Sequence, residues 1–498
     1  MIGLGREGLS RSEYTRIVRA REAFAIDPDA LATVAERRKR MLAHVGTGIP
    51  AYGITTGLGG LSARPVTALE QDDLQRSLLT ARAAGFGPPL PAEVVRGALL
   101  LRLAGFLQGA AGVSDVLCSQ IAMLLERGWS PVVPEGPYGA AGEIGPLAHL
   151  FQTLVGEGLV RIDGAVLPAA DALERIGIAP YRPSAKEGLA LINGSPFATA
   201  LGIDLADRFR VLVDTANVAA ALGIATIAGG ARALSPRVGT ISGDPGAVAV
   251  QQVLTAMLAG EDVWGDVAQP PVSFRVAPQV HAAAYAALGT LDAVLDRRLR
   301  GTTDSPLFLD ADDSGPAGLY PSGAFHAIDV VLGLEAVANA ACHVANLVEK
   351  RLQRLLDARF SGLPDQLTDR PGVQAGVVAL HKTVVGLTAD ARALATPVSV
   401  HAMDTSTGQE DVQAFTFLAA ARLARLLEDL ESALACELVA LRQAASLAGR
   451  PASGRLGSIV ATLASVVEPV DRDRTLSGDI ERVRELIASG SIRAGRES

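Results

Sequence analysis

Six long segments of this chain are rich in alanine and leucine, and several of them run for more than 25 residues. They cover residues 92–111, 197–229, 278–300, 323–357, 376–396 and 409–447. Helices of globular proteins average three to four turns, so segments of this length are typical of an extended helical bundle. Alternating apolar and polar residues, which indicate strands, are nearly absent. The sequence therefore predicts an all-α protein.

The amino-acid composition agrees with helices rather than sheets. Of the 498 residues, 49% are hydrophobic, which allows a large core, and only 4% are aromatic. A β-sandwich needs more aromatic and β-branched residues, whereas alanine and leucine favour close-packed helices. The length allows two to four domains, yet neither an internal repeat nor a low-complexity linker divides the chain. We expect one cooperative unit, with a helical and loop-rich region over 1–195 and a helical bundle over 196–498.

Charge and cysteine usage exclude several classes of partner. The net charge is −8, and basic residues are scattered rather than gathered in the stripe that a nucleic-acid partner requires. Cys118, Cys342 and Cys436 lie far apart, which fits neither a disulfide framework nor a metal site. No set of His, Cys, Asp and Glu has the spacing of metal ligands. The sequence predicts a reduced protein without a metal or a nucleic-acid partner.

The apolar stretches of the chain do not predict a membrane protein. The first residues, MIGLGREGLSR, meet charge before the apolar core of a signal peptide can form. Residues 211–231 are the most apolar stretch, but they contain Asp214 and Asn217, which a membrane helix would resist. A buried bundle helix is the better interpretation, and we expect a cytoplasmic protein.

Glycine-rich loops separate the predicted helices in the N-terminal region. The main loops are 52–61 (YGITTGLGGL), 134–146 (PEGPYGAAGEIGP) and 193–196 (NGSP). Loops held by a rigid scaffold frequently carry catalytic groups. We therefore expect the active site to be built on these loops.

Seven short segments, in order along nearly the whole chain, together resemble the motifs of one enzyme family. They are Tyr52–Gly59 (YGITTGLG), Gly139–His149 (GAAGEIGPLAH), Lys186–Gly194 (KEGLALING), Ser273–Gln279 (SFRVAPQ), Gly323–His326 (GAFH), Ser361–Pro364 (SGLP) and Gln409–Asp411 (QED). By these segments the chain is similar to the aromatic amino-acid lyases, the family of histidine and phenylalanine ammonia-lyases. Such a resemblance indicates fold and ancestry, whereas function depends on the site itself.

The resemblance implies an L-aspartase/fumarase-like long helical bundle with a loop-rich N-terminal active-site region. It also implies a homotetramer whose active sites are assembled from several subunits, and a small-molecule substrate that carries a carboxylate. The family removes ammonia from an aromatic amino acid to give an unsaturated acid. Its electrophilic cofactor, a methylidene-imidazolone, forms when an Ala-Ser-Gly tripeptide cyclises and the serine hydroxyl leaves as water.

The sequence departs from the family at the serine. The tripeptide here is Ala140-Ala141-Gly142, and alanine has no β-oxygen to expel. We therefore expect no methylidene-imidazolone and no other cofactor. Further departures from the family surround the same motifs; they are Arg82, Glu143, Val272, Arg298, Arg300 and Ala324. Correlated change of this kind indicates a natural repurposing rather than one isolated substitution.

The matching positions imply roles for five side chains. Tyr52 is the base that takes a β-proton; because a phenol is a weak base at neutral pH, it needs a neighbouring cation, and Arg82 is one candidate. Arg275 pairs with the substrate carboxylate through its bidentate guanidinium. Asn193 donates to the carboxylate or the α-substituent, and Gln279 hydrogen-bonds nearby. The structural alternatives are a packed loop tyrosine, a surface salt bridge, a turn asparagine and a helix-start glutamine.

Lys382 is the unusual residue of an otherwise apolar helical stretch, GVVALHKTVVGL (376–387). A buried ammonium group requires a partner or a lowered pKa, and the glutamate of the QED segment, Glu410, is the candidate partner. Together they can hold a proton near the substrate ring and activate it in place of the missing electrophile. Alternatively, Lys382 extends its ammonium group to the surface, and Glu410 with Asp411 favours a helix N-terminus.

The leading hypothesis is a cofactor-independent carbon–nitrogen lyase like the ergothionases of this family. These enzymes lack the electrophile and eliminate trimethylamine from ergothioneine to give thiourocanate, and their active-site lysine and glutamate fall at Lys382 and Glu410. A quaternary ammonium group leaves without protonation. An aromatic cage for this cation is expected, for which Phe325, Tyr138 and Phe274 are the candidates.

Two other functions fit the same sequence. Arg82, Arg298 and Arg300 favour a more anionic substrate, used in a different cofactor-free elimination, isomerisation, conjugate addition or cyclisation of specialised metabolism. The third possibility is a catalytically inactive homologue that acts as a binding or structural partner. The retained Tyr52 and Glu410 argue against it, because these residues contribute little to folding.

Restoring the serine tests whether the chain is a repurposed enzyme. We expect Ala141→Ser to gain no ammonia-lyase activity by itself, because Val272 and Ala324 also depart from the family. Ammonia release from histidine and phenylalanine, with the absorbance of the unsaturated acids, measures this. Deaminase activity arising from that one change would contradict the repurposing.

Overall fold

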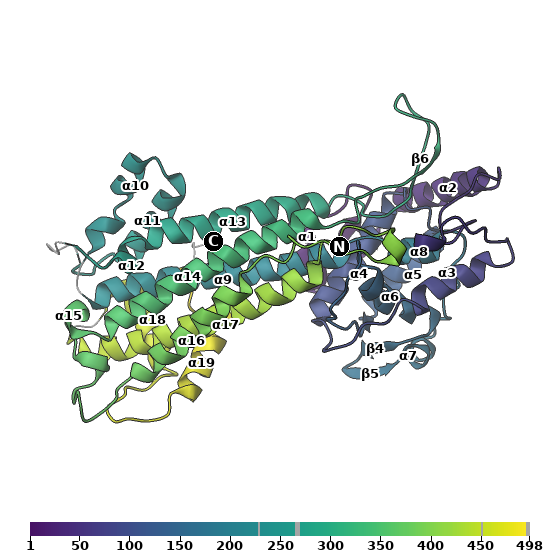
Figure 1. Ribbon diagram of the computed structural model, residues 1–498. Helices are drawn as coiled ribbons and strands as arrows, with labels where there is room; N and C mark the ends of the chain where they lie inside the picture. The colour runs from purple at the N-terminus through teal and green to yellow at the C-terminus, as the bar shows by residue number, and fades with distance from the viewer. Residues whose placement is uncertain (228–229, 264–268, 450–451, 495–498) are drawn as a thin grey trace. The chain divides into compact units, whose positions relative to one another are not determined.

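The computed structural model describes residues 1–227, 230–263, 269–449 and 452–494, and these residues are mainly helical (Figure 1). They form two compact units. Unit 1 comprises Met1–Asp204, Asp292–Leu332 and Val398–Ala420, and unit 2 comprises Leu205–Leu291, Gly333–Pro397 and Ala421–Ser498. The all-α prediction is confirmed, whereas the predicted division at residue 195 stays a prediction.

Five long helices correspond to five of the predicted Ala/Leu-rich segments. They are α9 (Pro196–Thr226), α13 (Ala277–Arg298), α14 (Ile328–Leu355), α16 (Val378–Leu394) and α17 (Thr416–Leu447). Their portions in unit 2 are tied together by hydrogen bonds such as that from Arg351 of α14 to Glu437 of α17 and the contact of His281 of α13 with Asn217 of α9. Residues 228–229 of the predicted 197–229 segment lie outside the described residues.

Two of these helices begin later than predicted. The predicted 323–357 and 409–447 helices start at Ile328 and Thr416, so residues 323–327 and 409–415 are loops. Phe415 has a φ of +52°, which a right-handed helix does not allow. These loops carry the GAFH and QED segments, so the late helix starts free their side chains for the pocket described below.

Shorter elements complete both units. The remaining α-helices of unit 1 are α1 (Arg11–Val18), α2 (Pro28–Val45), α3 (Gln71–Thr80), α4 (Ala92–Leu107), α5 (Asp115–Glu126), α6 (Ile144–Phe151), α7 (Ala169–Arg175) and α8 (Glu187–Ile192). Those of unit 2 are α10 (Pro236–Ser242), α11 (Pro245–Met257), α12 (Val272–Arg275), α15 (Ala358–Ser361), α18 (Gly454–Ala464) and α19 (Ser477–Ala488). The 3-10 turns are η1 (Gly59–Leu61), η2 (Gln152–Val155), η3 (Ala231–Leu234), η4 (Asp365–Leu367) and η5 (Ser406–Gly408).

The strands are short and all lie in unit 1. A parallel pair joins β1 (Ile2–Leu4) to β2 (Phe24–Ile26). An antiparallel sheet holds β3 (Ser130–Pro131), β4 (Leu159–Ile162) and β5 (Ala165–Pro168) in that order. The hairpin of β6 (Leu307–Leu309) and β7 (Gly318–Tyr320) is antiparallel. None of these strands exceeds four residues, which explains why the sequence pattern did not indicate them.

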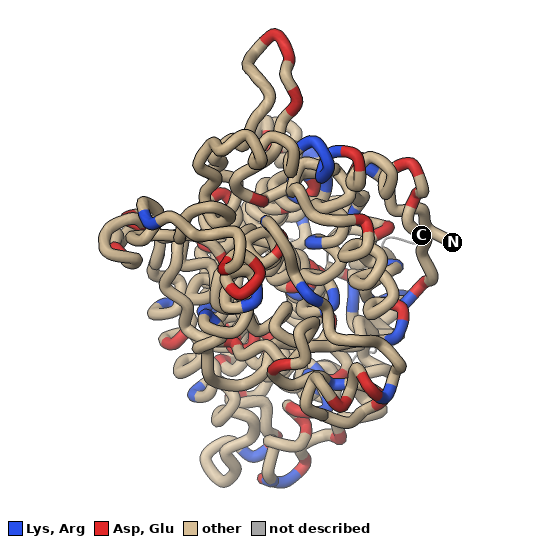
Figure 2. Tube along the Cα trace, turned by 90° about the vertical axis from the view of Figure 1, so that its right-hand side faces the viewer, with Lys and Arg blue, Asp and Glu red and all other residues tan. Residues whose placement is uncertain are grey.

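Charged residues of both signs alternate along the trace. Figure 2 shows lysine and arginine interspersed with aspartate and glutamate, and the described part of the chain presents no continuous basic stripe in that view. Two helical stretches, Glu187–Thr226 and Ile328–Leu355, are long and apolar enough to cross a membrane by length and composition alone. In the first, 89% of the most apolar window is buried inside the chain, which is also what a bundle core helix shows.

A fully buried ion cluster holds unit 1 together behind the loops. The side chains of Lys186, Arg102 and Asp304 are 0%, 2% and 0% exposed. Lys186 Nζ donates to Asp304 Oδ2 at 2.6 Å and to the carbonyl of Ala111 at 3.0 Å. Arg102 donates to Asp304 Oδ1 at 3.1 Å and to the carbonyl of Ala190. One carboxylate therefore serves two cations and two backbone carbonyls supply further acceptors, while the buried Arg102 Nε has no hydrogen-bond partner among the described residues.

The next residue of the KEG segment, Glu187, joins further loops. Its carboxylate accepts from the backbone N–H of Ser114 at 3.0 Å and of Ser184 at 2.9 Å. It also accepts from the Tyr181 hydroxyl at 2.9 Å and lies 3.3 Å from Arg38 Nη1. Lys186 and Glu187 therefore fix the start of α8, whose C-terminal end carries Asn193.

Removing the shared carboxylate should destabilise unit 1 strongly. Asp304→Ala leaves Lys186 and Arg102 buried without a counter-charge, and we expect the free energy of unfolding to fall by about 3–5 kcal/mol. Asp310→Ala is the control, because Asp310 forms only partly exposed pairs with Arg37 and Arg40, worth about 1 kcal/mol or less. Urea unfolding followed by circular dichroism measures both; equal losses would contradict the role of the cluster.

Candidate active site

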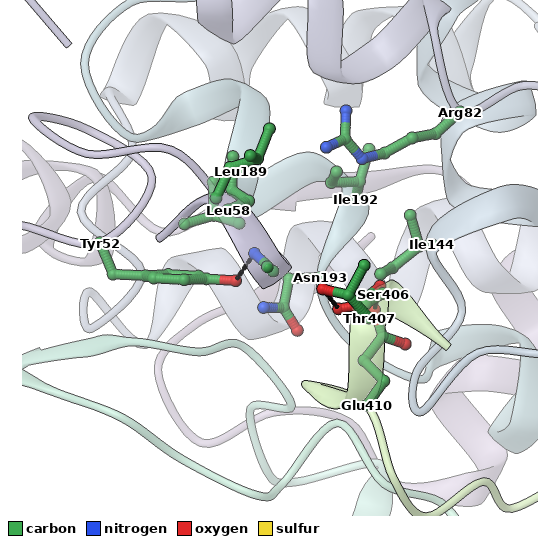
Figure 3. A pocket seen from close by; sticks show the side chains of 13 residues that line it. Tyr52, Leu58, Arg82, Ile144, Leu189, Ile192, Asn193, Ser406, Thr407 and Glu410 are labelled. Atoms are coloured by element: carbon green, nitrogen blue, oxygen red, sulfur yellow. Dashed lines mark hydrogen bonds between the residues drawn. The ribbon is translucent and has the colours of Figure 1, made fainter. Parts of the chain in front are cut away.

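Two cavities of unit 1 share the lining residues Tyr52, Ile144, Asn193 and Glu410. The smaller, of about 350 Å³, extends to Arg82 (Figure 3). The larger, of about 600 Å³, extends to Phe325 and the GAFH loop. The loops that the sequence singled out therefore meet at one place, and the lining combines apolar walls with a few convergent polar groups, as ligand sites do.

Tyr52 is held at the edge of this pocket by its own loop. Its hydroxyl oxygen accepts from the backbone N–H of Gly59 at 3.0 Å, and the side chain is 38% exposed. Gly53 has a φ of +68°, and a Cβ there would lie 2.6 Å from Leu189 Cδ2. Glycine therefore lets the loop turn close to α8 and brings the phenol to the cavity.

Arg82 provides positive charge beside the phenol. It follows α3, lines the smaller cavity, and its guanidinium has no hydrogen-bond acceptor among the described residues. Burial lowers the pKa of Arg82, and the charges of Tyr52 and Glu410 oppose that shift. Arg82 thus lies in the same cavity lining as Tyr52, and the role of Tyr52 as the base stays a prediction.

The degenerate cofactor loop is bound by a carboxylate. The backbone N–H of Ala141 donates to Glu410 Oε2 at 2.9 Å, and the Ser406 hydroxyl donates to Glu410 Oε1 at 2.8 Å. Ala141 and Gly142 line the larger cavity, whereas Ala140 does not. The Ala141 side chain is a methyl group, which offers neither a leaving hydroxyl nor a nucleophile. The residues present therefore do not fit the family's serine-derived electrophile.

Asn193 faces both cavities from the C-terminal end of α8. Its Nδ2 donates to the carbonyl of Ser305 at 2.8 Å, next to the buried Asp304. The second N–H and the amide oxygen remain for a ligand. Asn193 is thereby attached to the ion cluster, which gives this donor a fixed position.

Glu143, noted only as a departure from the family, is a fully buried carboxyl group behind the loop. It accepts from the backbone N–H of Phe197 at 2.7 Å and from that of Ala198, and so caps the start of α9. Burial raises the pKa of Glu143 to about 8, although these hydrogen bonds and the charges of Arg298 and Arg102 oppose the shift. No local sequence pattern signals this role, because the two N–H groups that Glu143 binds lie 54 and 55 residues away.

Of the three extra arginines, only Arg82 lines the pocket. Arg298 is 11% exposed and is paired with Asp329, while Arg300 is exposed at the surface. Arg298 and Arg300 therefore do not line these two cavities in the single chain, and their expected contribution to the charge of the site stays a prediction. Sequence position could not show this, because the partner Asp329 lies 31 residues away.

Only one of the three aromatic cage candidates lines the pocket. Phe325 faces the larger cavity. The Tyr138 hydroxyl donates to the carbonyl of Pro134 at 2.9 Å, and its ring packs edge-on against Phe417 at 4.9 Å between centroids. Phe274 is buried in unit 2. Phe325 and Tyr52 are therefore the aromatic rings available to a ligand in the described lining of these two cavities.

Three of the predicted site residues lie in unit 2. Arg275 ends α12, Gln279 lies exposed in the first turn of α13, and Lys382 is exposed on α16. Lys382 is thus not buried within the single chain, and its pairing with Glu410 stays a prediction. Three or more His, Cys, Asp or Glu side chains placed to hold a metal ion do not occur among the described residues.

Comparison with known proteins covers nearly the whole chain. A family model described as aromatic amino acid lyase matches residues 9–467. The histidine ammonia-lyase of Symbiobacterium thermophilum is 34% identical over 98% of this chain and 97% of its own length.

Two solved structures show the same architecture. Histidine ammonia-lyase from Trypanosoma cruzi superposes with a TM-score of 0.88 at 27% identity, covering 99% of this chain and 94% of that one. Ergothionase from Treponema denticola, in complex with desmethyl-ergothioneine sulfonic acid, gives a TM-score of 0.93 at 24% identity and covers 99% of both chains. At that identity the second likeness concerns the fold alone. Together they confirm the predicted aspartase/fumarase-like helical fold.

Glu143 should make the stability of the protein depend on pH. With a pKa of about 8 in the fold against 4.5 for the free side chain, Glu143 is protonated in the folded chain and ionised in the unfolded chain between these values. Unfolding then releases a proton, so its contribution is lost as pH rises from about 4.5 to 8, by up to about 1.4 kcal/mol per pH unit. Glu143→Gln stays neutral and should remove this slope.

Denaturant unfolding of both proteins between pH 5 and 8 measures the difference. Because all other titrating groups are shared, the wild type should become less stable relative to Glu143→Gln as pH rises. Parallel curves would contradict a protonated Glu143.

Proposed function

The chain belongs to the aromatic amino acid lyase family, and on that premise we propose that it is a cofactor-independent carbon–nitrogen lyase. We propose that it eliminates trimethylamine from ergothioneine to give thiourocanate. The observation that carries the proposal is the loop of Ala140, Ala141 and Gly142, which lacks the serine hydroxyl and is bound instead by the carboxylate of Glu410.

The missing hydroxyl limits the chemistry. Without a leaving oxygen on Ala141, the methylene of the family's electrophile does not form, so the substrate itself must carry a good leaving group. A quaternary ammonium departs as a neutral amine without a proton. Acid and base groups of the chain are then sufficient for the elimination.

Tyr52 is the proposed base. With Arg82 as the neighbouring cation, it takes a proton from the CH₂ group next to the ring. The electrons of that C–H bond form the new carbon–carbon double bond, and the C–N bond breaks with its electron pair leaving on trimethylamine. The products are thiourocanate, trimethylamine and a protonated Tyr52.

Lys382 and Glu410 are the proposed activators of the ring. A lysine that donates to the ring thione draws electrons from the ring and acidifies the adjacent CH₂ group. Lys382 is exposed on the single chain, which fits a homotetramer in which another copy brings Lys382, Arg275 and Gln279 to the site. Arg275 would then bind the substrate carboxylate.

The charges of the larger cavity suit a cationic leaving group. Glu410 and Asp411 line it together with the ring of Phe325, and an aromatic face attracts a quaternary ammonium. Arg298, which would repel the cation, is neutralised by Asp329. We also propose that the enzyme is cytoplasmic and acts on a soluble metabolite.

A more anionic substrate is the second candidate. Arg82 favours it, because this guanidinium lines the smaller cavity and has no hydrogen-bond acceptor in the described residues. Such a substrate would undergo another cofactor-free elimination or isomerisation at the same Tyr52.

The first assay is incubation of the purified protein with ergothioneine, with trimethylamine measured by mass spectrometry and thiourocanate by absorbance. We expect both products, and we expect Tyr52→Phe and Lys382→Met to lower turnover by about 100-fold or more, through loss of the base and of the ring activation. Lys39→Met is the matched control, because Lys39 is an exposed lysine on α2, and it should turn over normally.

Two outcomes would contradict the proposal. Full activity of the Lys382→Met variant would contradict the proposed ring activation. Absence of both products with a folded tetramer would contradict ergothioneine as the substrate. Histidine serves as the comparison substrate, given the names of the relatives. Ammonia release from it, or an intact mass two water molecules below that of the sequence, would contradict a cofactor-free enzyme.

A further inference from the structure

The guanidinium of Arg298 joins three segments that border the pocket. Its Nη1 donates to the Ser195 hydroxyl at 2.9 Å, and its Nη2 donates to the carbonyl of His326 at 3.1 Å. Its Nε lies 3.0 Å from Asp329 Oδ1 and 3.1 Å from Oδ2. A planar group with several fixed donors suits this task, whereas a lysine could not serve all three segments.

The first segment carries Asn193. Ser195 lies two residues after it, and the backbone N–H of Ser195 donates to Thr303 Oγ1 at 3.0 Å. Asn193 itself is tied to the carbonyl of Ser305. Arg298 therefore holds the far end of the short turn from which Asn193 faces both cavities.

The second segment carries Phe325. The His326 carbonyl that Arg298 binds belongs to the adjacent residue, within a turn closed by a hydrogen bond from His326 N–H to the carbonyl of Gly323 at 3.0 Å. A Cβ at Gly142 would lie 3.3 Å from the Phe325 ring and 3.6 Å from the Gly194 carbonyl oxygen. The loop that holds Ala141 is thus packed between the Phe325 turn and the Asn193 turn.

The third segment is the start of α14, where Asp329 supplies the counter-charge. Asp329 lies in the first turn of α14 and also accepts from the backbone N–H of Val330 at 3.0 Å. Glu143 also lies close enough that the charge of Arg298 acts to lower the Glu143 pKa. Arg298 is therefore neutralised outside the pocket and contributes geometry rather than charge to it.

We propose that Arg298 is a positioning residue that sets the separation of Asn193 and Phe325 across the loop of Ala141 and Gly142. The proposal rests on the proposed function for its kinetic consequence, although the geometry itself does not. A shift of about 1 Å in a substrate-positioning group can lower a rate by about 100-fold. Arg298 acts through Asn193 and Phe325 without lining either cavity.

The activity-independent test is hydrogen–deuterium exchange of Arg298→Met. We expect the amides of residues 193–195 and 323–327 to exchange at least about tenfold faster, since both segments lose a hydrogen bond. Arg297→Met is the matched control, because Arg297 lies on the same helix end and donates only to the carbonyl of Ala293. Should Arg298→Met fail to fold, Arg298→Lys keeps the charge and is expected to show the same local change.

A double-mutant cycle with Asn193→Ala supplies the kinetic test. If Arg298 acts through Asn193, introducing Arg298→Met into the otherwise wild-type chain lowers ergothioneine turnover by about 100-fold. Introducing it into the Asn193→Ala variant lowers turnover by clearly less. Equal factors in both backgrounds would indicate a purely structural arginine and overturn the proposal.

The two tests separate this inference from the proposed function. A wild type that releases no trimethylamine overturns the proposed function, while faster exchange confined to the two segments still supports the positioning role. Unchanged exchange at both segments, or a uniform increase over unit 1, overturns the positioning role whatever the turnover.

Discussion

The burial of two cations around one carboxylate is the constraint on which the site depends. Lys186 and Arg102 are out of contact with solvent, and Asp304 lies between them as the carboxylate that pairs with both. Asp304 precedes Ser305, whose carbonyl holds Asn193. The position of the Asn193 amide, which faces both cavities, is thus set by an ion cluster that lines neither of them.

The loop of Ala140, Ala141 and Gly142 lacks the serine hydroxyl, yet it still borders the pocket, where its N–H contacts a carboxylate. Ala141 offers the pocket only a methyl group and a backbone N–H, and the N–H is bound by Glu410. At this point the loop offers a methyl group and a carboxylate-bound N–H, which is why proton transfer is the chemistry proposed here. Tyr52, the proposed base, lines both cavities, and Arg82 lines the smaller one.

The departures from the family divide by what surrounds them. Ala141 and Arg82 line the pocket and alter its chemistry. Glu143 and Arg298 lie behind it, where one caps α9 and the other joins three segments. Arg300 is exposed at the surface. The departures therefore include residues that pack behind the site as well as residues that line it.

The sequence by itself determined the helical architecture and the loss of the cofactor hydroxyl at Ala141, because both are local. Helical periodicity needs only neighbouring residues, and the absence of an oxygen is a property of one side chain. The resemblance to the family, rather than such local reasoning, predicted that Tyr52, Arg82, Asn193 and Glu410 belong to one site.

Only the tertiary structure decided which charges act in that pocket. Arg298 and Arg82 look alike in the sequence, yet one is neutralised by Asp329, 31 residues away, and the other faces the cavity. Lys186 finds its partner 118 residues away. Pairing at such separations depends on how distant segments pack, which no local sequence pattern records. Only this pairing distinguishes a charged group that faces the pocket from one that stabilises the fold.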